Sequence, residues 1–172
     1  DGTALLSHAK ILDPDDQWLF LPALKRVKRI SSSNKSGPFV GSEFAFEDFT
    51  AQELNKFEYT YVGEEACGEM TCDVVERRPL YENSGYVRQI SWIDQDVYQL
   101  RKVDFYDRGD ALLKTLTFGD YREYDGGVWR AHELIMVNHK TGKQTDMVFS
   151  DFEFKTGLSD KDFVKGVLAR VR

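Results

Sequence analysis

The sequence predicts a mainly β fold built around one large, strongly curved antiparallel sheet. Apolar and polar residues alternate with a period of two over most of the 172 residues, which is typical of strands whose two faces meet different surroundings. Turn signals recur about every ten residues, and the 12 Phe, 8 Tyr and 3 Trp favour strands. Large sheets curl or close because their strands twist. The concave side of such a sheet requires either a cover or a ligand.

Ten segments carry the strand pattern, and specific turn chemistry separates several of them. Residues 13–16, Asp-Pro-Asp-Asp, form a proline-containing turn. Residues 107–110, 125–127 and 140–143 each supply glycine where a tight hairpin needs a positive φ. The predicted strands are residues 4–11, 17–21, 24–30, 57–65, 72–78, 86–94, 98–107, 111–124, 128–139 and 144–154.

Helical signals are confined to two segments. Thr50 and Glu53 have the spacing of a capping box at the start of residues 50–57, which predicts two helical turns there. In "GLSDKDFVKGVLARV", Ser159 precedes acidic residues, and apolar residues then recur at intervals of four. This pattern predicts an amphipathic C-terminal helix. Residues 31–42 are the only long irregular stretch.

Length and charge restrict the class of protein. A chain of 172 residues fits one domain, residues 1–172, with a substantial core. The balance of 23 basic against 29 acidic residues gives a net charge of -6, which argues against nucleic-acid binding because such domains usually carry a basic excess. No apolar run approaches the ~20 residues of a transmembrane helix. The chain starts at Asp1 and not at Met, so we expect a processed or trimmed product.

The two cysteines, Cys67 and Cys72, flank a predicted turn at residues 68–70. Across such a hairpin the pair can approach disulfide distance, which would imply an oxidising compartment. A metal site would usually need C-x-x-C spacing and further ligands, and none lies nearby. Two reduced cysteines at a turn remain the alternative.

Several predicted strands are apolar on both faces, which a sheet with one wet face would not need. Either loops and helices cover the second face, or that face lines a cavity. Strand parity, with the resemblance described below, gives a candidate ligand-binding set. Outside the loop of residues 31–49 this set is Trp18, Phe20, Ile90, Trp92, Leu116, Phe118, Leu134, Met136, Met147 and Phe149. Additional core beneath the loops is the alternative for each of them.

The sequence shows few residues in arrangements that support catalysis, so we expect that the protein is not an enzyme. A G-x-S-x-G elbow is absent, and Ser42 is the only serine of interest as a nucleophile. His132 and His139 fall on opposite strand faces by parity, which argues against a shared metal site. The paired carboxylates lie at turns or at a helix start, where turn and cap roles explain them. No catalytic residue, metal site or cofactor is therefore predicted.

A cluster of positive charge, Lys25, Arg26, Lys28 and Arg29, follows Pro22 in this acidic chain. Apolar residues are interleaved, so the charges fall on both faces of a strand. One interpretation is an edge strand whose charges block pairing with another sheet. The other is a docking patch for an anionic membrane surface or a partner protein.

The stretch "DDQWLFLPALKRVKRISSSNKSGPFVGSEFAFEDF" resembles the signature of the bacterial outer membrane lipoprotein-sorting protein family, the LolA-like group. The match combines a Trp-Leu-aromatic-Leu-Pro strand, a basic strand ending in Arg-Ile, a serine-rich loop and a Phe-rich acidic stretch. These parts are residues 18–22, 29–30, 31–33 and 39–48. Residues 114–149 and 157–170 also look similar to the family, so the resemblance covers most of the chain.

The resemblance implies a half-open antiparallel β-barrel in the periplasm, with short helices and loops covering its concave face. Relatives carry lipoprotein acyl chains, so the implied function is a carrier or sensor of lipoprotein acyl chains or other lipids. Some members look like partners of inner-membrane lipid exporters. A non-catalytic module that docks on such an exporter or envelope complex is therefore the alternative. Members usually carry a signal peptide and further N-terminal residues, so the N-terminal part of the full-length protein is expected to be missing here.

This resemblance gives a hypothesis for Phe39, Phe44 and Phe46. The loop that carries them contains glycine on both sides of Pro38 and can bend sharply. The three rings could cover the mouth of the cavity as a removable plug, in place of a lipid tail. Each buried methylene contributes about 0.8 kcal/mol, so an acyl chain could compete with a few aromatic contacts. In the alternative, these phenylalanines are permanent core.

Overall fold

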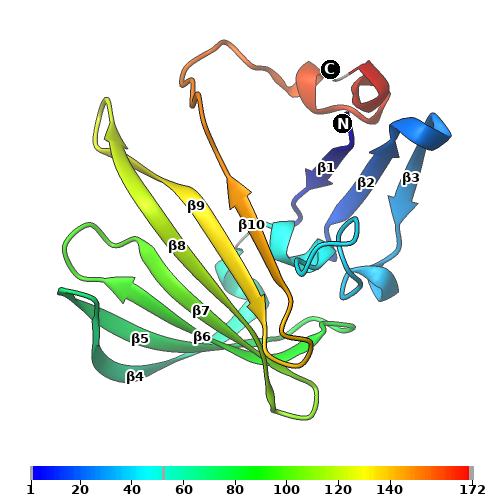
Figure 1. Cartoon of the computed structure of the whole chain (residues 1–172). Coiled ribbons are helices and arrows are strands. Elements are labelled where there is room, and N and C mark those ends of the chain that lie inside the picture. Colours follow the sequence, from blue (N-terminus) through cyan, green and yellow to red (C-terminus); the bar gives the residue numbers. More distant parts are fainter. Residues whose placement is uncertain (1, 52, 171–172) are drawn as a thin grey trace.

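The computed structural model describes residues 2–51 and 53–170. Within these ranges, ten strands form two antiparallel sheets (Figure 1). The small sheet has the order β1-β2-β3, and the large sheet has the order β10-β9-β8-β7-β6-β5-β4. The strands are β1 (Ala4–His8), β2 (Asp16–Leu21), β3 (Arg26–Ile30), β4 (Phe57–Cys67), β5 (Met70–Pro79), β6 (Tyr86–Asp94), β7 (Leu100–Asp107), β8 (Leu112–Tyr124), β9 (Val128–Asn138) and β10 (Gln144–Val148).

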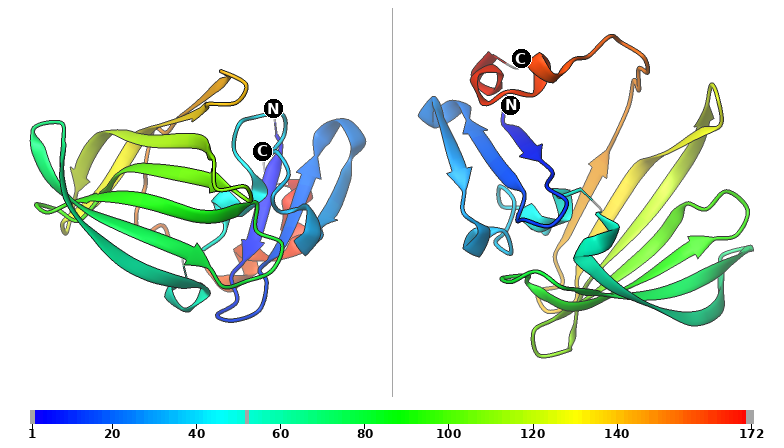
Figure 2. Two further views of the ribbon diagram at one scale, coloured as in Figure 1. Left: turned by 90° about the horizontal axis from the view of Figure 1, so that it is seen from below. Right: turned by 180° about the vertical axis from the view of Figure 1, so that it is seen from behind.

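The large sheet curves strongly and stays open between its edge strands β4 and β10 (Figure 2). The small sheet stands opposite its concave side, with the segment that joins β3 to β4 between them. The predicted mainly β, half-open barrel is confirmed, and the structure adds that its first three strands form a separate sheet. They separate because residues 31–51 and 53–56 make only short 3₁₀ turns and one isolated bridge, between Pro38 and Ala45.

All ten predicted strands are present, but four of them are shorter than expected by two residues or more. β1 ends at His8, β3 begins at Arg26, β7 begins at Leu100 and β10 ends at Val148. Left-handed backbone explains three of these ends. Lys25 has a φ of 47° just before β3. Tyr98 has a φ of 55° just before β7, and Asp151 has a φ of 55° just after β10. Such residues turn the chain away from the extended conformation that a strand requires.

The helical predictions are wrong in type. Among the described residues of the first segment, 50–51 and 53–57, the one helical element is the 3₁₀ turn η4 (Leu54–Lys56). The C-terminal segment forms two 3₁₀ helices, η5 (Asp160–Phe163) and η6 (Lys165–Arg170). Extended backbone at Val164 interrupts a continuous helix, in a stretch where glycine and β-branched residues lower helix propensity. Gln52 and Val171, which the two predicted helices include, lie outside the described residues. The other 3₁₀ elements are η1 (Pro22–Leu24), η2 (Ser32–Asn34) and η3 (Phe46–Phe49).

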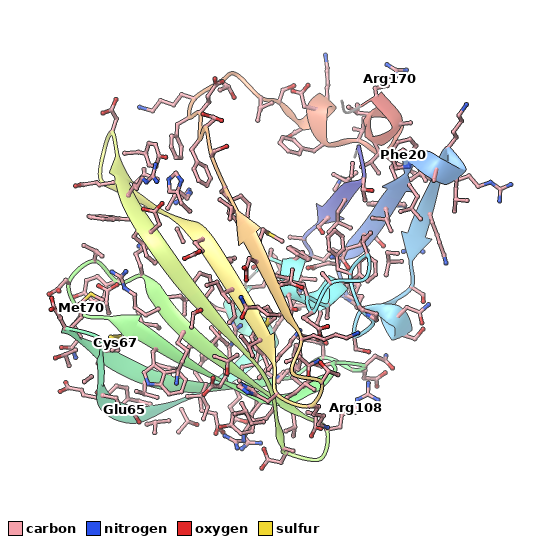
Figure 3. The ribbon with its side chains drawn as sticks, in the orientation of Figure 1. Phe20, Glu65, Cys67, Met70, Arg108 and Arg170 are labelled. Atoms are coloured by element: carbon pink, nitrogen blue, oxygen red, sulfur yellow. A yellow bond between two sulfur atoms is a disulfide. The ribbon has the colours of Figure 1, made fainter. Side chains whose placement is uncertain are left out.

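Both faces of the small sheet contact other segments of the chain. On its inner face, Leu19 and Ile30 pack with Phe46 of the connecting segment. On its outer face lies η6, which contacts all three strands and buries Leu168. Phe20 points to this side, toward the segment that ends near Arg170 (Figure 3).

The segment from residue 149 to 159 has no regular structure and connects β10 to η5. We call these residues the strap, because they run from the edge of the large sheet to the small sheet (Figures 1 and 2). The strap thus links the edge strand of the large sheet to the C-terminal 3₁₀ helices beside the small sheet by irregular backbone.

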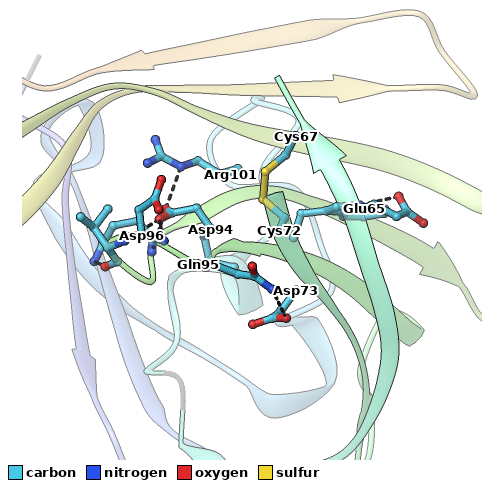
Figure 4. The surroundings of a disulfide bond; sticks show 12 residues. Glu65, Cys67, Cys72, Asp73, Asp94, Gln95, Asp96 and Arg101 are labelled. Atoms are coloured by element: carbon cyan, nitrogen blue, oxygen red, sulfur yellow. Dashed lines mark hydrogen bonds and ion pairs between the residues drawn. A yellow bond between two sulfur atoms is a disulfide. The ribbon is translucent and has the colours of Figure 1, made fainter. Parts of the chain in front are cut away.

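Cys67 and Cys72 form a disulfide across the β4–β5 hairpin, with their Cα atoms 5.9 Å apart. The disulfide predicted from the sequence is therefore present (Figure 4). Cys72 is fully buried and packs with Val74 and Trp92. Beside this cluster, Arg101 Nε bonds to the buried Asp94 at 2.9 Å.

Candidate functional site

The loop of residues 37–49, which we call the wedge, fills one end of the space between the two sheets. It is a small hairpin in which the Phe39 amide donates to the Phe44 carbonyl at 2.7 Å. Its four rings form one cluster, with Phe39 centred 4.7 Å from Phe49 and 5.5 Å from Phe46. Phe44 enters the core of the large sheet and is 2% exposed. The wedge therefore joins the two apolar cores.

A buried ion pair anchors the wedge to the large sheet. Lys114 Nζ on β8 lies 2.7 Å from Asp48 Oδ2, and both side chains are 4% exposed. Asp48 also accepts hydrogen bonds of 2.7 Å from the Tyr86 hydroxyl and from the Ala45 amide. The Lys114 ammonium donates further to the Glu43 carbonyl at 3.2 Å. Because each charge is compensated by several partners, the network can exist in a water-free core.

A second carboxylate fixes the other side of the wedge. Glu47 accepts from the Gly85 amide at 2.8 Å and from the Ser84 hydroxyl at 2.9 Å, and the Tyr81 hydroxyl lies 3.4 Å away. A Cβ at Gly85 would lie 2.8 Å from Glu47 Oε1 and 2.9 Å from Ser36 Cβ, so only glycine fits there. Burial raises the pKa of Glu47, and the two shorter hydrogen bonds partly offset that rise.

These contacts favour the alternative in which the wedge is permanent core. Two acidic residues of the motif, Glu47 and Asp48, anchor the wedge to the large sheet and to the loop that precedes β6. Removing Phe44 from the core would expose apolar surface and would separate the Lys114–Asp48 pair from its hydrogen-bond partners. Ser42 has a local role as well, since its hydroxyl donates to the Phe39 carbonyl at 2.6 Å within the turn.

The other end of the concave face is open. A groove of about 460 Å³ lies there, and we call it the mouth groove. Its walls come from the β6–β7 turn, from the outer halves of β8 and β9, and from the strap. The lining residues are Tyr98, Gln99, Leu100, Phe118, Tyr121, Trp129, Arg130, Ala131, Leu134, Phe149 and Phe152. Its volume is within the range of about 300–1,000 Å³ that is usual for small-molecule sites.

The strap is held over this end mainly by His132 of β9. The ring Nδ1 of His132 lies 2.8 Å from the Phe149 carbonyl, and the Phe149 amide donates to the His132 carbonyl at 2.8 Å. A carbonyl only accepts, so Nδ1 carries a hydrogen and Nε2 can accept from the Tyr124 hydroxyl at 2.8 Å. Phe152 packs edge-on against the His132 ring at 5.1 Å. Phe149 nevertheless remains 37% exposed.

The candidate ligand-binding set outside residues 31–49 divides into three groups. Leu116 and Met136 are core residues beneath Phe44, and Met147 packs against that core. Phe118, Leu134 and Phe149 line the mouth groove. Cross-strand pairs Leu116–Met136 and Phe118–Leu134 place these four residues on one face of the sheet.

The remaining four residues of the candidate ligand-binding set do not point to the concave face. Ile90 and Trp92 pair with Asp104 and Lys102, so they share the convex face, where the Lys102 ammonium lies 3.4 Å from the centre of a Trp92 ring. Trp18 and Phe20 face the outer side of the small sheet, because Leu19 between them faces inward.

Sequence reasoning missed Lys114, Glu47 and His132 as structural anchors. Lys114 had a readable signal, because it lies two residues before Leu116 on an otherwise apolar face. His132 had no such signal, since its partner Phe149 belongs to a segment that was predicted as strand. His139, the residue after the end of β9, contacts the Thr115 hydroxyl at 2.8 Å on a different face of the sheet.

In the described part of the chain, no helix has the length and apolarity to cross a membrane.

Comparisons with known proteins agree with this architecture. A family model described as an uncharacterised protein matches residues 1–170. No significant match occurs among curated proteins. The structure is similar to a crystallised "putative outer membrane lipoprotein-sorting protein domain" from Vibrio parahaemolyticus, with 52% identity, a TM-score of 0.95, and coverage of 98% of this chain and 72% of that one.

Two further crystal structures are similar. A DUF1329 family protein from Desulfovibrio piger has 30% identity and a TM-score of 0.91, with coverage of 98% of this chain and 71% of that one. A LolA superfamily protein from Nitrosomonas europaea has 23% identity and a TM-score of 0.69, with coverage of 88% and 67%, and shows the shared fold alone. The chain therefore belongs to the same family as the Vibrio lipoprotein-sorting domain and the Desulfovibrio DUF1329 protein, as the sequence resemblance predicted.

Proposed function

We propose that this protein is a non-catalytic carrier or sensor of acyl lipids in the bacterial periplasm, and that the mouth groove receives the hydrocarbon chain. The observation that carries the proposal is an apolar-walled groove of about 460 Å³ on the concave face of a lipoprotein-sorting fold. The disulfide between Cys67 and Cys72 agrees with an oxidising compartment such as the periplasm.

The walls of the groove suit a hydrocarbon chain. Phe118 and Leu134 form a continuous apolar surface with the core beneath them. Phe149 and Phe152 of the strap face them from the other side. Each methylene that moves from water into such a site contributes about 0.8 kcal/mol, so several methylenes together give measurable affinity.

The strap provides the movable part that such a site requires. It has no regular structure, and among the described residues its hydrogen bonds to β9 are those between His132 and Phe149. Phe152 and Phe154 add ring contacts with His132 and Arg130 of β9. Few ordered contacts per residue are typical of segments that open locally. A ligand chain would enter by displacing the strap, while the wedge stays in place.

Displacement of a fluorescent fatty acid tests the site. Leu134→Gln should weaken fatty-acid binding by about tenfold, because it puts a polar group into the apolar wall. Ile135→Gln is the matched control: Ile135 is the next residue on β9, is similarly half-buried and faces the opposite side of the sheet. Native mass spectrometry of protein extracted from cells should detect lipid mass on the wild type and less on Leu134→Gln.

The alternative is a module that docks on an inner-membrane exporter or envelope complex without a ligand of its own. It predicts that extracted protein carries no lipid mass. It also predicts that both variants, folded by circular dichroism, bind the fatty acid no differently from the wild type. That combination of results would contradict the carrier proposal.

A further inference from the structure

A second groove lies at the free edge of the small sheet, and we call it the edge groove. Its volume is about 430 Å³. Its floor consists of Leu19, Leu21 and Ile30 from the inner face of the sheet and Phe46 from the wedge. The opposite wall is the loop of residues 33–38, which contributes polar serine and asparagine side chains. The groove is thus apolar at the bottom and polar along one side.

Two cations project from the apolar face of this sheet. Lys28 is the cross-strand partner of Leu19, and Arg26 is the partner of Leu21, so both point to the same side as the groove floor. Lys28 itself lines the groove. Arg29 also borders the groove, but its side chain projects to the other face, where it forms an ion pair with Asp16. Arg26 lies next to the groove, outside its lining.

Neither Arg26 nor Lys28 has an ion-pair partner among residues 2–51 and 53–170, although the chain carries 29 acidic residues. Edge strands do use charges to block pairing with other sheets. That role requires charge alone and does not require a groove with an apolar floor beside it. Uncompensated cations next to an apolar hollow are instead complementary to a molecule that has both an anion and a hydrocarbon chain.

We propose that the edge groove binds an amphiphile with an anionic headgroup. Its hydrocarbon chain would lie on Leu19, Leu21 and Ile30, and its headgroup would contact the Lys28 ammonium and the Arg26 guanidinium. Charge-assisted hydrogen bonds from these cations are the stronger kind, and the serine hydroxyls of the facing loop supply further donors. This site is separate from the mouth groove and does not depend on the proposed function.

Titration calorimetry with dodecyl phosphate, dodecyl maltoside and inorganic phosphate tests the headgroup and the chain separately, with the two dodecyl compounds kept below their critical micelle concentrations. The titrations use the Leu134→Gln variant, in which binding at the mouth groove is weakened. Dodecyl phosphate should bind at least tenfold more tightly than either of the other two. Its affinity should fall as salt rises, because salt screens exposed charges.

Lys28→Gln should weaken dodecyl phosphate binding by about fivefold. The matched control, Lys143→Gln, removes the same charge from the exposed β9–β10 turn and should leave the affinity unchanged. Equal binding of dodecyl phosphate and dodecyl maltoside would overturn the proposal, as would equal losses in the two lysine variants. Absence of dodecyl phosphate binding would also overturn it and would leave β3 as an edge for an acidic protein segment. None of these results bears on fatty-acid binding at Leu134.

Discussion

The buried pair of Lys114 and Asp48 gives the sharpest test of whether the wedge is fixed. Lys114→Met keeps much of the side-chain length and removes the charge. Asp48 would then be a buried carboxylate, 4% exposed, without its cation. Breaking a buried pair by removing one partner costs about 3–5 kcal/mol.

The structure places the expected value near the lower end of that range. Asp48 keeps two donors at 2.7 Å, the Ala45 amide and the Tyr86 hydroxyl, so its negative charge is still partly compensated. The Glu43 carbonyl loses its contact with Lys114. We therefore expect Lys114→Met to lower the free energy of unfolding by about 3 kcal/mol, a large part of the ~5–15 kcal/mol of a typical domain.

Urea denaturation of four proteins measures this quantity: wild type, Lys114→Met, Asp48→Asn and the double variant. Because the two side chains interact directly, the double variant should be more stable than the sum of the single losses predicts, by more than 1 kcal/mol. A loss below about 1 kcal/mol in Lys114→Met, together with tighter fatty-acid binding, would refute the reasoning. That result would restore the removable-plug hypothesis for the wedge.

Three other perturbations have defined outcomes. Val40 and Gly41 are the two left-handed residues of the wedge turn, with φ of 49° and 77°. Because Asn-Gly suits such a turn and valine does not, Val40→Asn should raise the free energy of unfolding, measured by urea denaturation, by about 1 kcal/mol. A decrease would contradict this prediction. Because the pKa of Glu47 is raised in the folded protein, the free energy of unfolding of the wild type should fall as pH rises from the ordinary pKa of a glutamate through the raised one. Glu47→Gln should remove this part of the dependence of stability on pH. An unchanged dependence would contradict the prediction. Tyr124→Phe removes the hydroxyl that donates to His132, so limited proteolysis should cleave the strap faster, whereas cleavage at the wild-type rate would show that His132 does not depend on it.

Parity along a strand grouped residues by face correctly on β8 and β9, where the register is regular. β8 and β9 pair without a bulge, so residues with the same parity on both strands share a face: Leu116 with Met136, and Phe118 with Leu134. The hairpin turn fixes this register, and the hairpin is local in sequence. Local information was therefore sufficient there.

Parity failed where the sheet has bulges and where two faces are both apolar. The β6–β7 pairing shifts near Tyr86 and again near Trp92. Each shift exchanges the faces of the residues beyond it. Ile90 and Trp92 are apolar because they cover the convex face beside the disulfide, and their sequence carries no mark of which side is concave. Only the long-range packing decides that.

The wedge could be recognised from its motif but not understood from it. Phe44, Glu47 and Asp48 are close in sequence, yet their partners lie on β8 and in the β5–β6 loop, and Lys114 is 66 residues from Asp48. A carboxylate in a loop usually suggests a turn or a cap. Its role as an anchor becomes visible only when the opposing cation is placed.

The division of the concave face into a fixed end and an open end leads to a prediction about local opening. In the wedge, the Phe39 and Glu47 amides donate to backbone carbonyls beside buried rings and carboxylates. In the strap, the Phe149 amide donates to the His132 carbonyl of β9. If the strap opens and the wedge does not, hydrogen exchange measured by NMR should be fast at Phe149 and close to the rate of global unfolding at Phe39 and Glu47. A hydrocarbon chain bound in the mouth groove would then change exchange at Phe149 only. Equal protection at the three amides would mean that the strap and the wedge open together, and the entry route through the strap would have to be abandoned.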